Sequence, residues 1–154
     1  MKSNLGIAAA VMLAWIAAPA LGQQKPAESD QRVLDDLLKK YELAFNRQDA
    51  ASLTAIYTED AIRVTPQGVL RGRDAIRKDY EATFKAGGHD ISLTTKAVLP
   101  AGDFIWNAGE WTAKFGDQPA HGFYTGTLTR DGKIRFNMYN VTPPPTAMQQ
   151  SANK

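Results

Sequence analysis

Residues 41–49, YELAFNRQD, mark the place where one predicted helix ends and a second begins. Upstream of this junction, apolar side chains recur at three- and four-residue spacing over residues 34–45, which indicates one amphipathic helix. Ser29 and Asp30 are both suited to cap its start. We therefore expect the first helix to begin at one of these two residues and to end near Arg47.

Two further helices and a short strand follow the junction. Asp49 is suited to cap a short second helix, and residues 61–65 predict a strand. Gly72 opens a third helix, which the pair Gly87 and Gly88 closes, since C-terminal caps commonly place glycine there.

From residue 90 onward the pattern alternates between apolar and polar side chains, which indicates strands. Four are predicted, over residues 91–99, 104–115, 120–130 and 133–142. The dipeptide Asp131-Gly132 predicts a tight hairpin with positive φ at both positions. Three glycines inside the strands are candidate points of bending: Gly109, Gly122 and Gly126. Helices followed by a long antiparallel sheet give an α+β fold whose strands curve around the helices.

The first 22 residues are predicted to be a signal peptide. Lys2 precedes an apolar run over residues 5–18, and Ala20 and Gly22 place small side chains where a signal peptidase cleaves. The alternative is a permanent membrane anchor, although the run is shorter than the roughly 20 residues that a spanning helix needs. We expect export to the periplasm or the medium, a flexible lead-in over 23–28, one domain over 29–142 and a disordered tail over 143–154.

Composition limits the partners and cofactors. The protein has 18 Lys and Arg against 16 Asp and Glu, and removal of Lys2 with the leader leaves 17 against 16. This balance argues against nucleic acid, which needs a concentrated basic face, and nothing predicts membrane binding after cleavage. The sequence has no Cys and two isolated His, so no metal site is expected. It has neither a phosphate loop nor a dinucleotide fingerprint, so no cofactor is expected.

Three stretches resemble signatures of the nuclear transport factor 2-like superfamily. Residues 41–49 resemble its opening helix, break and second helix, and residues 57–61 (YTEDA) resemble its first strand entry. Residues 72–76 (GRDAI) resemble the glycine-led start of its third helix. Over residues 29–142 the chain is thus similar to SnoaL-like and ketosteroid-isomerase-like domains. The resemblance implies three N-terminal helices in the concave face of a curved antiparallel sheet, a cone-shaped, cystatin-like roll around an apolar pocket.

The superfamily includes isomerases, polyketide cyclases, dehydratases, epoxide hydrolases and non-catalytic binding domains, so function has to be argued from the site. In ketosteroid isomerases a tyrosine and a protonated aspartate hold the enolate oxygen while a second aspartate moves the proton. The resemblance places the tyrosine at Tyr41, the second donor at about Tyr124 and the base at Thr65. Because a hydroxyl does not accept a proton as a carboxylate does, the usual isomerase chemistry is not expected.

Two other residues are candidates for chemistry beside Tyr41. Arg63 shares a strand face with Thr65, and inside the pocket it would bind a carboxylate or enolate oxygen. The alternative is that it reaches the rim and pairs with Asp or Glu. His121 is a candidate general base, with a structural or surface role as the alternative.

Aromatic side chains from helices and sheet are expected to line the pocket together with polar neighbours, although each aromatic alone could simply fill the core. The candidate ligand-binding residues are Tyr41, Tyr57, Arg63, Thr65, Tyr80, Phe84, Trp111, Phe123, Tyr124 and Tyr139. Because strand side chains alternate, Glu110 faces away from the pocket if Trp111 faces it.

Two functional hypotheses follow. The favoured one is an exported domain that binds a small apolar or aromatic, steroid- or polyketide-like molecule without the usual isomerase chemistry. The alternative is an isomerase, cyclase or dehydratase that acts on such a molecule through Tyr41 and Arg63. The resemblance also implies a homodimer through the outer sheet face, where Trp106 is expected.

Overall fold

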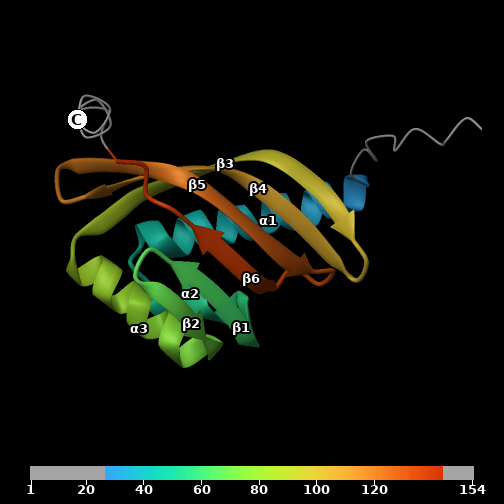
Figure 1. The fold of residues 1–154 in the computed structure, drawn as a ribbon, viewed down its shortest axis with the longest axis horizontal. Helices are drawn as coiled ribbons and strands as arrows, with labels where there is room; N and C mark the ends of the chain where they lie inside the picture. Colours follow the sequence, from blue (N-terminus) through green and yellow to red (C-terminus); the bar gives the residue numbers. More distant parts are fainter. Residues whose placement is uncertain (1–26, 144–154) are drawn as a thin grey trace, which may run out of the picture.

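The computed structural model describes residues 27–143, and Figure 1 shows three helices against a long sheet. The predicted signal peptide, residues 23–26 of the lead-in and the tail from 144 lie outside the described residues. The elements in chain order are α1 (Glu28–Asn46), α2 (Ala50–Ala55), β1 (Tyr57–Thr65), β2 (Gly68–Arg71), α3 (Gly72–Lys85), β3 (Gly88–Ala101), β4 (Phe104–Phe115), β5 (Gln118–Thr129) and β6 (Ile134–Tyr139).

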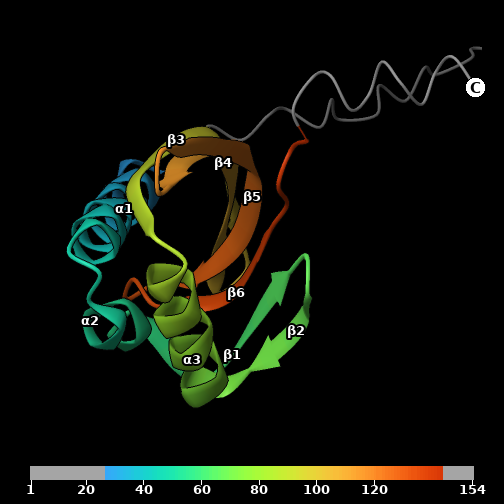
Figure 2. The same ribbon diagram turned by 90° about the vertical axis from the view of Figure 1, so that its left-hand side faces the viewer.

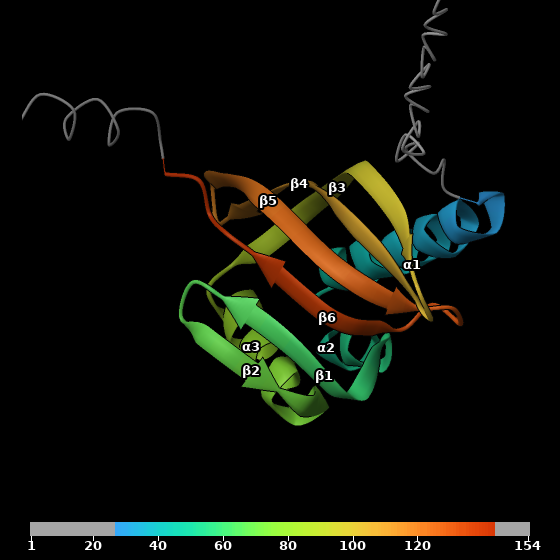
Figure 3. The ribbon, with the colours of Figure 1, turned by 45° about the vertical axis from the view of Figure 1, so that its right-hand side comes forward.

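The six strands form one curved, unclosed sheet in the order β2-β1-β6-β5-β4-β3. Neighbours are antiparallel except β1 and β6, which pair in parallel and lie side by side in Figure 3. Figure 2 shows the helices on the concave side of the curl. The α+β fold with helices in a concave sheet is therefore confirmed. Within residues 27–143, no helix is both long and apolar enough to span a bilayer.

The helix ends follow the predicted caps in two of three cases. The Asp49 carboxylate accepts a hydrogen bond from the Ser52 backbone N–H at 2.9 Å and so caps α2. Gly72 and Gly87 have positive φ at the start and the end of α3. The predicted cap of α1 at Ser29 or Asp30 is wrong, because the helix already begins at Glu28 and the Asp30 side chain is buried against Arg130.

The strand predictions hold most closely for residues 104–115, which are β4. The predicted hairpin at Asp131-Gly132 is wrong in detail. Gly132 has a φ of 81°, but the only non-glycine residues with positive φ in residues 27–143 are Gln48 and Asp90. The register shifts between Thr127 and Leu128 where β5 meets β6, so the connection is a longer, irregular turn.

Gly109 and Gly122 serve close packing, and Gly109 also pairs with Thr95 at the register shift between Thr95 and Ala97 of β3, which agrees with its prediction as a point of bending or bulging. Both lie in the continuous β4–β5 register. A Cβ on Gly109 would lie 2.2 Å from the Thr94 carbonyl oxygen, and one on Gly122 would lie 2.1 Å from the Asn140 carbonyl oxygen. Glycine at these positions lets the neighbouring backbone and the rings of Trp111 and Tyr124 approach the sheet closely.

We predict that Gly122→Ala lowers the free energy of unfolding by about 2–3 kcal/mol, because the added methyl group meets backbone that cannot move away. The matched control is Gly116→Asn: Gly116 has a φ of 57° and open space around its Cα. Since asparagine tolerates that conformation, the control should change stability by less than about 1 kcal/mol. Urea denaturation measures both variants, and equal losses would contradict the packing role of Gly122.

Candidate functional site

A cavity lies between α1 and the concave face of the sheet, with a volume of about 100 Å³. Its walls are mostly apolar, and Leu34, Leu37 and Leu128 are among them. The polar side chains that line it come from α1, α3 and the strands, and they are Tyr41, Arg63, Thr83, Asn107, Tyr124, Thr125, Asn137 and Tyr139.

Arg63 on β1 is the charged centre of this cavity. The residue is 5% exposed, although arginine is rarely buried so deeply. Its Nε donates to Asp79 Oδ2 at 3.1 Å, and its Nη1 donates to the hydroxyls of Tyr57 at 3.1 Å and Tyr80 at 2.8 Å. The rings of Tyr80 and Tyr139 cover the guanidinium, with centroids 4.5 and 4.8 Å from Cζ. Hydrogen bonds and cation–π contacts thus offset the cost of burying the charge.

Three tyrosine hydroxyls continue the network toward the cavity. Tyr80 donates to Tyr41 at 2.9 Å, and the hydroxyls of Tyr57 and Tyr80 share a hydrogen bond at 2.6 Å. The Tyr57 hydroxyl also lies 3.4 Å from Asn137 Oδ1. Tyr41 accepts from this chain and lines the cavity, so its own proton is left to bind an acceptor there.

Burial changes how these groups titrate. Removal from water raises the pKa of Tyr57 and of Tyr80 well above the ordinary phenol value near 10, and the Arg63 charge only partly opposes this. Desolvation lowers the pKa of the Arg63 guanidinium, but the surrounding tyrosines outweigh it and the pKa is raised. At neutral pH the network therefore holds a cation and neutral phenols, all of them donors.

The sheet supplies the opposite wall. The Trp111 Nε1 donates to the Asn140 carbonyl oxygen at 3.0 Å, and its ring meets Tyr139 edge-on with centroids 6.0 Å apart. The Tyr124 hydroxyl lies 3.2 Å from Thr95 Oγ1. Burial raises the pKa of both Tyr124 and Tyr139. These rings are held in place by their polar atoms, which leaves their faces and edges to form the cavity wall.

The structure brings five of the predicted site residues to the cavity lining: Tyr41, Arg63, Trp111, Tyr124 and Tyr139. Tyr57 and Tyr80 are completely buried behind them and bond to Arg63 rather than line the cavity. Phe84 packs edge-on against Phe45, 5.2 Å between centroids, as part of the core.

Three predicted site residues lie away from the cavity, which corrects their sequence-based placement. Phe123 is 56% exposed and pairs with Glu110 in the sheet, while His121 is exposed and pairs with Thr112. Both occupy the outer face, because Trp111 and Tyr124 take the inner one and side chains alternate. Thr65 is buried, but its hydroxyl donates to the Gly68 carbonyl oxygen and accepts from the Gln67 N–H, so it stabilises the β1–β2 turn.

Sequence reasoning missed Asp79, Asn107 and Asn137. Two alternatives were open for Arg63: a place inside the pocket, or a place at the rim paired with Asp or Glu. The structure combines features of both, since Arg63 lines the cavity and bonds to Asp79. The signal for Asp79 was its place next to Tyr80 on one helix. Asn107 and Asn137 occupy inward strand positions, which only the register between β4, β5 and β6 reveals.

The cavity has no evident proton acceptor of the kind that isomerases use. Among residues 27–143, those that line it include no Asp or Glu. The Asp79 carboxylate is engaged by Arg63 Nε and is not part of the lining. In the same part of the chain, no group of three or more His, Asp or Glu is placed to hold a metal ion.

Comparison with known proteins agrees with this architecture. A family model described as a SnoaL-like domain matches residues 38–137. A ketosteroid isomerase-like protein from Erwinia carotovora atroseptica SCRI1043 is similar, with 20% identity, a TM-score of 0.63, and coverage of 73% of this chain and 96% of that one. An NTF-2 like protein of unknown function from Shewanella oneidensis MR-1 gives 19% identity, a TM-score of 0.63, and coverage of 71% and 98%.

A domain of unknown function with a cystatin-like fold from Nostoc punctiforme PCC 73102 is also similar, with 15% identity, a TM-score of 0.66, and coverage of 83% of this chain and 86% of that one. At these identities the structures establish the fold alone. Comparison with curated proteins gives no significant match.

We predict that the free energy of unfolding falls as the pH rises above about 10, the ordinary phenol pKa. The folded state holds the protons of Tyr57 and Tyr80 more tightly than the unfolded state does, so their contribution is complete below that pH and is lost above it. Urea denaturation at increasing pH, with phenolate absorbance as a second readout, measures this. Ionisation of all five tyrosines near pH 10 without unfolding would contradict the buried network.

Proposed function

The chain belongs to the SnoaL-like domain family, and from that premise we propose that it binds a small apolar or aromatic molecule in the cavity between α1 and the sheet. The observation that carries this proposal is a mostly apolar cavity lining that includes a small set of polar groups, Arg63 and Tyr41 among them. Apolar walls exclude water and make the burial of a ring or alkyl chain favourable, and a few fixed polar groups orient the bound molecule.

The size of the cavity sharpens the ligand class. A volume of about 100 Å³ is below the roughly 150 Å³ of a leucine-lined cavity that accepts benzene. A short alkyl chain therefore fits as the cavity stands, and a single ring requires the walls to move outward slightly. A steroid-sized ligand would require the helices or the Trp111 side chain to move outward, so we favour the smaller aromatic or apolar molecules of the predicted class.

Binding is favoured over isomerisation by the chemistry of the groups present. Proton transfer at carbon needs a base within hydrogen-bond reach of the substrate. The expected base position, Thr65, carries a hydroxyl that is engaged in the β1–β2 turn. Two carboxylates of residues 27–143 lie next to lining residues, and both are engaged outside the lining: Asp79 accepts from Arg63 Nε, and Glu42 accepts from the Leu93 backbone N–H at 2.6 Å.

One observation supports the alternative, an isomerase, cyclase or dehydratase. The Tyr41 hydroxyl receives a hydrogen bond from Tyr80, whose oxygen is in turn bonded to Arg63 Nη1. Such a chain polarises the terminal hydroxyl and makes it a stronger donor to a developing oxyanion. Substrate turnover that Tyr41→Phe abolishes would establish this alternative.

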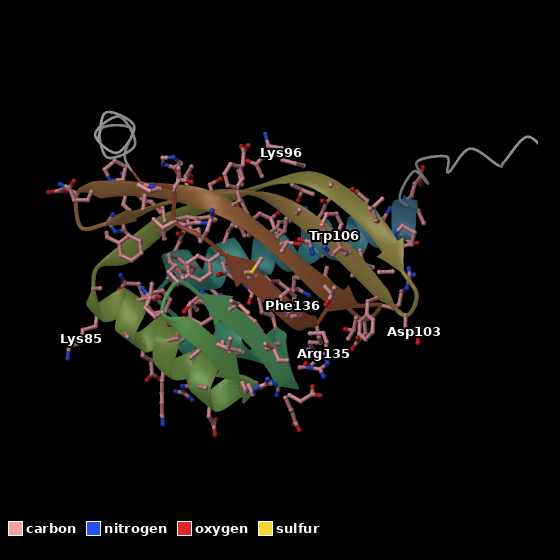
Figure 4. All side chains as sticks on the ribbon, in the orientation of Figure 1. Lys85, Lys96, Asp103, Trp106, Arg135 and Phe136 are labelled. Carbon is pink, nitrogen blue, oxygen red and sulfur yellow. The ribbon has the colours of Figure 1, made fainter. Side chains whose placement is uncertain are left out.

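Export and self-association complete the proposal. Trp106, labelled in Figure 4, has the opposite strand parity to the inward Trp111 and so belongs to the outer face, and Met138 and Leu99 are 42% and 44% exposed. An apolar face of this kind suits a homodimer. N-terminal sequencing of the exported protein tests cleavage before Gln23, and sedimentation of the purified protein tests dimer formation.

We predict that filling the cavity abolishes ligand binding. In Ala113→Leu the larger side chain enters the cavity wall, and binding of small aromatic compounds should weaken at least tenfold. The matched control is Ala108→Leu, five residues earlier on the other face of the same strand, which should leave binding unchanged. Fluorescence of Trp111 in a Trp106→Phe background measures binding.

Because overpacking costs about 1–3 kcal/mol, thermal unfolding has to show that both variants remain folded. Equal binding by folded Ala113→Leu and Ala108→Leu would place the ligand outside the cavity and contradict the proposal.

A further inference from the structure

We propose that the ligand of this cavity carries a carboxylate, and that Arg63 Nη2 and the Tyr41 hydroxyl bind it. The inference rests on the proposed function, since it assigns a chemical class to the molecule in the same cavity. The ligand would be a small aryl or alkyl carboxylate, with its apolar part toward Leu34 and Leu128 and its charged group at Arg63.

The first argument is an account of the donors on Arg63. A guanidinium has five N–H groups, and a buried donor without an acceptor is costly. One N–H on Nε and both on Nη1 are used by Asp79, Tyr57 and Tyr80. None of the hydrogen bonds that Arg63 makes with residues 27–143 uses Nη2. The Tyr139 hydroxyl also lies close enough to Arg63 for a hydrogen bond that lowers the tyrosine's pKa, so at least one N–H group of Nη2 remains for an acceptor.

The second argument is where these donors point. The rings of Tyr80 and Tyr139 cover the guanidinium, Asp79 occupies its Nε side and the two hydroxyls occupy Nη1. Since Arg63 still lines the cavity, the Nη2 edge is the part of its head group left to meet a ligand. Tyr41 lines the same cavity, is joined to Arg63 Nη1 through the Tyr80 oxygen, and offers one more proton.

The third argument is charge. Arg63 is the one charged residue among those of 27–143 that line the cavity. An anion that enters meets a cation and neutral donors, with no lining carboxylate to repel it, whereas a cationic ligand meets only repulsion. In these surroundings the anion's desolvation is offset by charge-assisted hydrogen bonds, which are the strongest kind that a neutral protein interior provides.

The shape of the site selects a carboxylate among anions. With Nε and Nη1 engaged, one N–H of Nη2 donates to one carboxylate oxygen and the Tyr41 hydroxyl donates to the other, so the site calls for a group with two acceptor oxygens. A phosphate dianion has three terminal oxygens and a second negative charge. One arginine in an apolar cavity of about 100 Å³ leaves the second charge without a cation and at least one oxygen without a donor. A phenolate or enolate offers a single oxygen and leaves Nη2 partly unused.

Titration calorimetry on the mature protein with matched pairs of compounds tests the proposal. The pairs are benzoate with benzamide, phenylacetate with phenylacetamide, and hexanoate with hexanamide. We expect the carboxylate of at least one pair to bind ten or more times more tightly than its amide. Tyr41→Phe should weaken the carboxylate about tenfold and leave the amide unchanged.

Arg63→Gln should remove the preference for the carboxylate. The matched control is Arg135→Gln, since Arg135 pairs with Asp60 outside the cavity and should have no effect on the preference. If Arg63→Gln fails to fold, the ratio of carboxylate to amide in the wild type and in Tyr41→Phe still decides.

The outcomes separate the two proposals. Equal or tighter binding of the amides, or tighter binding of phenols than of carboxylates, overturns the carboxylate and leaves a binding cavity in place. Binding of no compound, charged or neutral, overturns the proposed function and the carboxylate with it. A carboxylate preference that survives in folded Arg63→Gln overturns the role of Arg63.

Discussion

Burial of a guanidinium in an apolar interior costs several kcal/mol of desolvation free energy unless its N–H groups are hydrogen-bonded. Because Arg63 is buried, the elements around it have to supply acceptors for these groups. Asp79 and Tyr80 from α3 and Tyr57 from β1 bond to it, and the Tyr139 ring from β6 lies over it. These contacts fix the third helix against the parallel β1–β6 pair. The place where the sheet changes from antiparallel to parallel pairing is therefore also where Arg63 meets the cavity.

The rest of the cavity follows from this arrangement. Apart from the polar groups in its lining, the cavity is formed by the leucines of α1 and by apolar residues of β4 and β5 such as Trp111 and Leu128. Glycine at 109 and 122 lets neighbouring rings and backbone approach closely enough to close the wall. The same fold that serves isomerases here presents donors without a carboxylate in the lining. Such a set of groups is the basis of our proposal that the cavity recognises an acceptor-bearing ligand.

The order of helices and strands was predictable, because the spacing of apolar residues and the glycines at turns and helix ends are local sequence signals. Tyr41 and Arg63 were predictable as cavity residues, one from the resemblance and one from strand parity. The hydroxyl contact between Tyr57 and Tyr80, and the role of Asp79, depend on how α3 lies against β1, which no local pattern encodes. Phe123 and Tyr124 are neighbours on a strand and cannot both face inward, so only the β4–β5 register could choose between them.

The central claim is that Arg63 lies inside the cavity with Nη2 available to a ligand, and nitrogen NMR of its guanidinium tests this directly. Loss of one signal in Arg63→Lys assigns the resonance. The account predicts that the Arg63 N–H protons exchange slowly with water and that their shifts change when a small aryl carboxylate is added. An Arg63 signal that exchanges as fast as those of exposed arginines, and that no carboxylate moves, would contradict it.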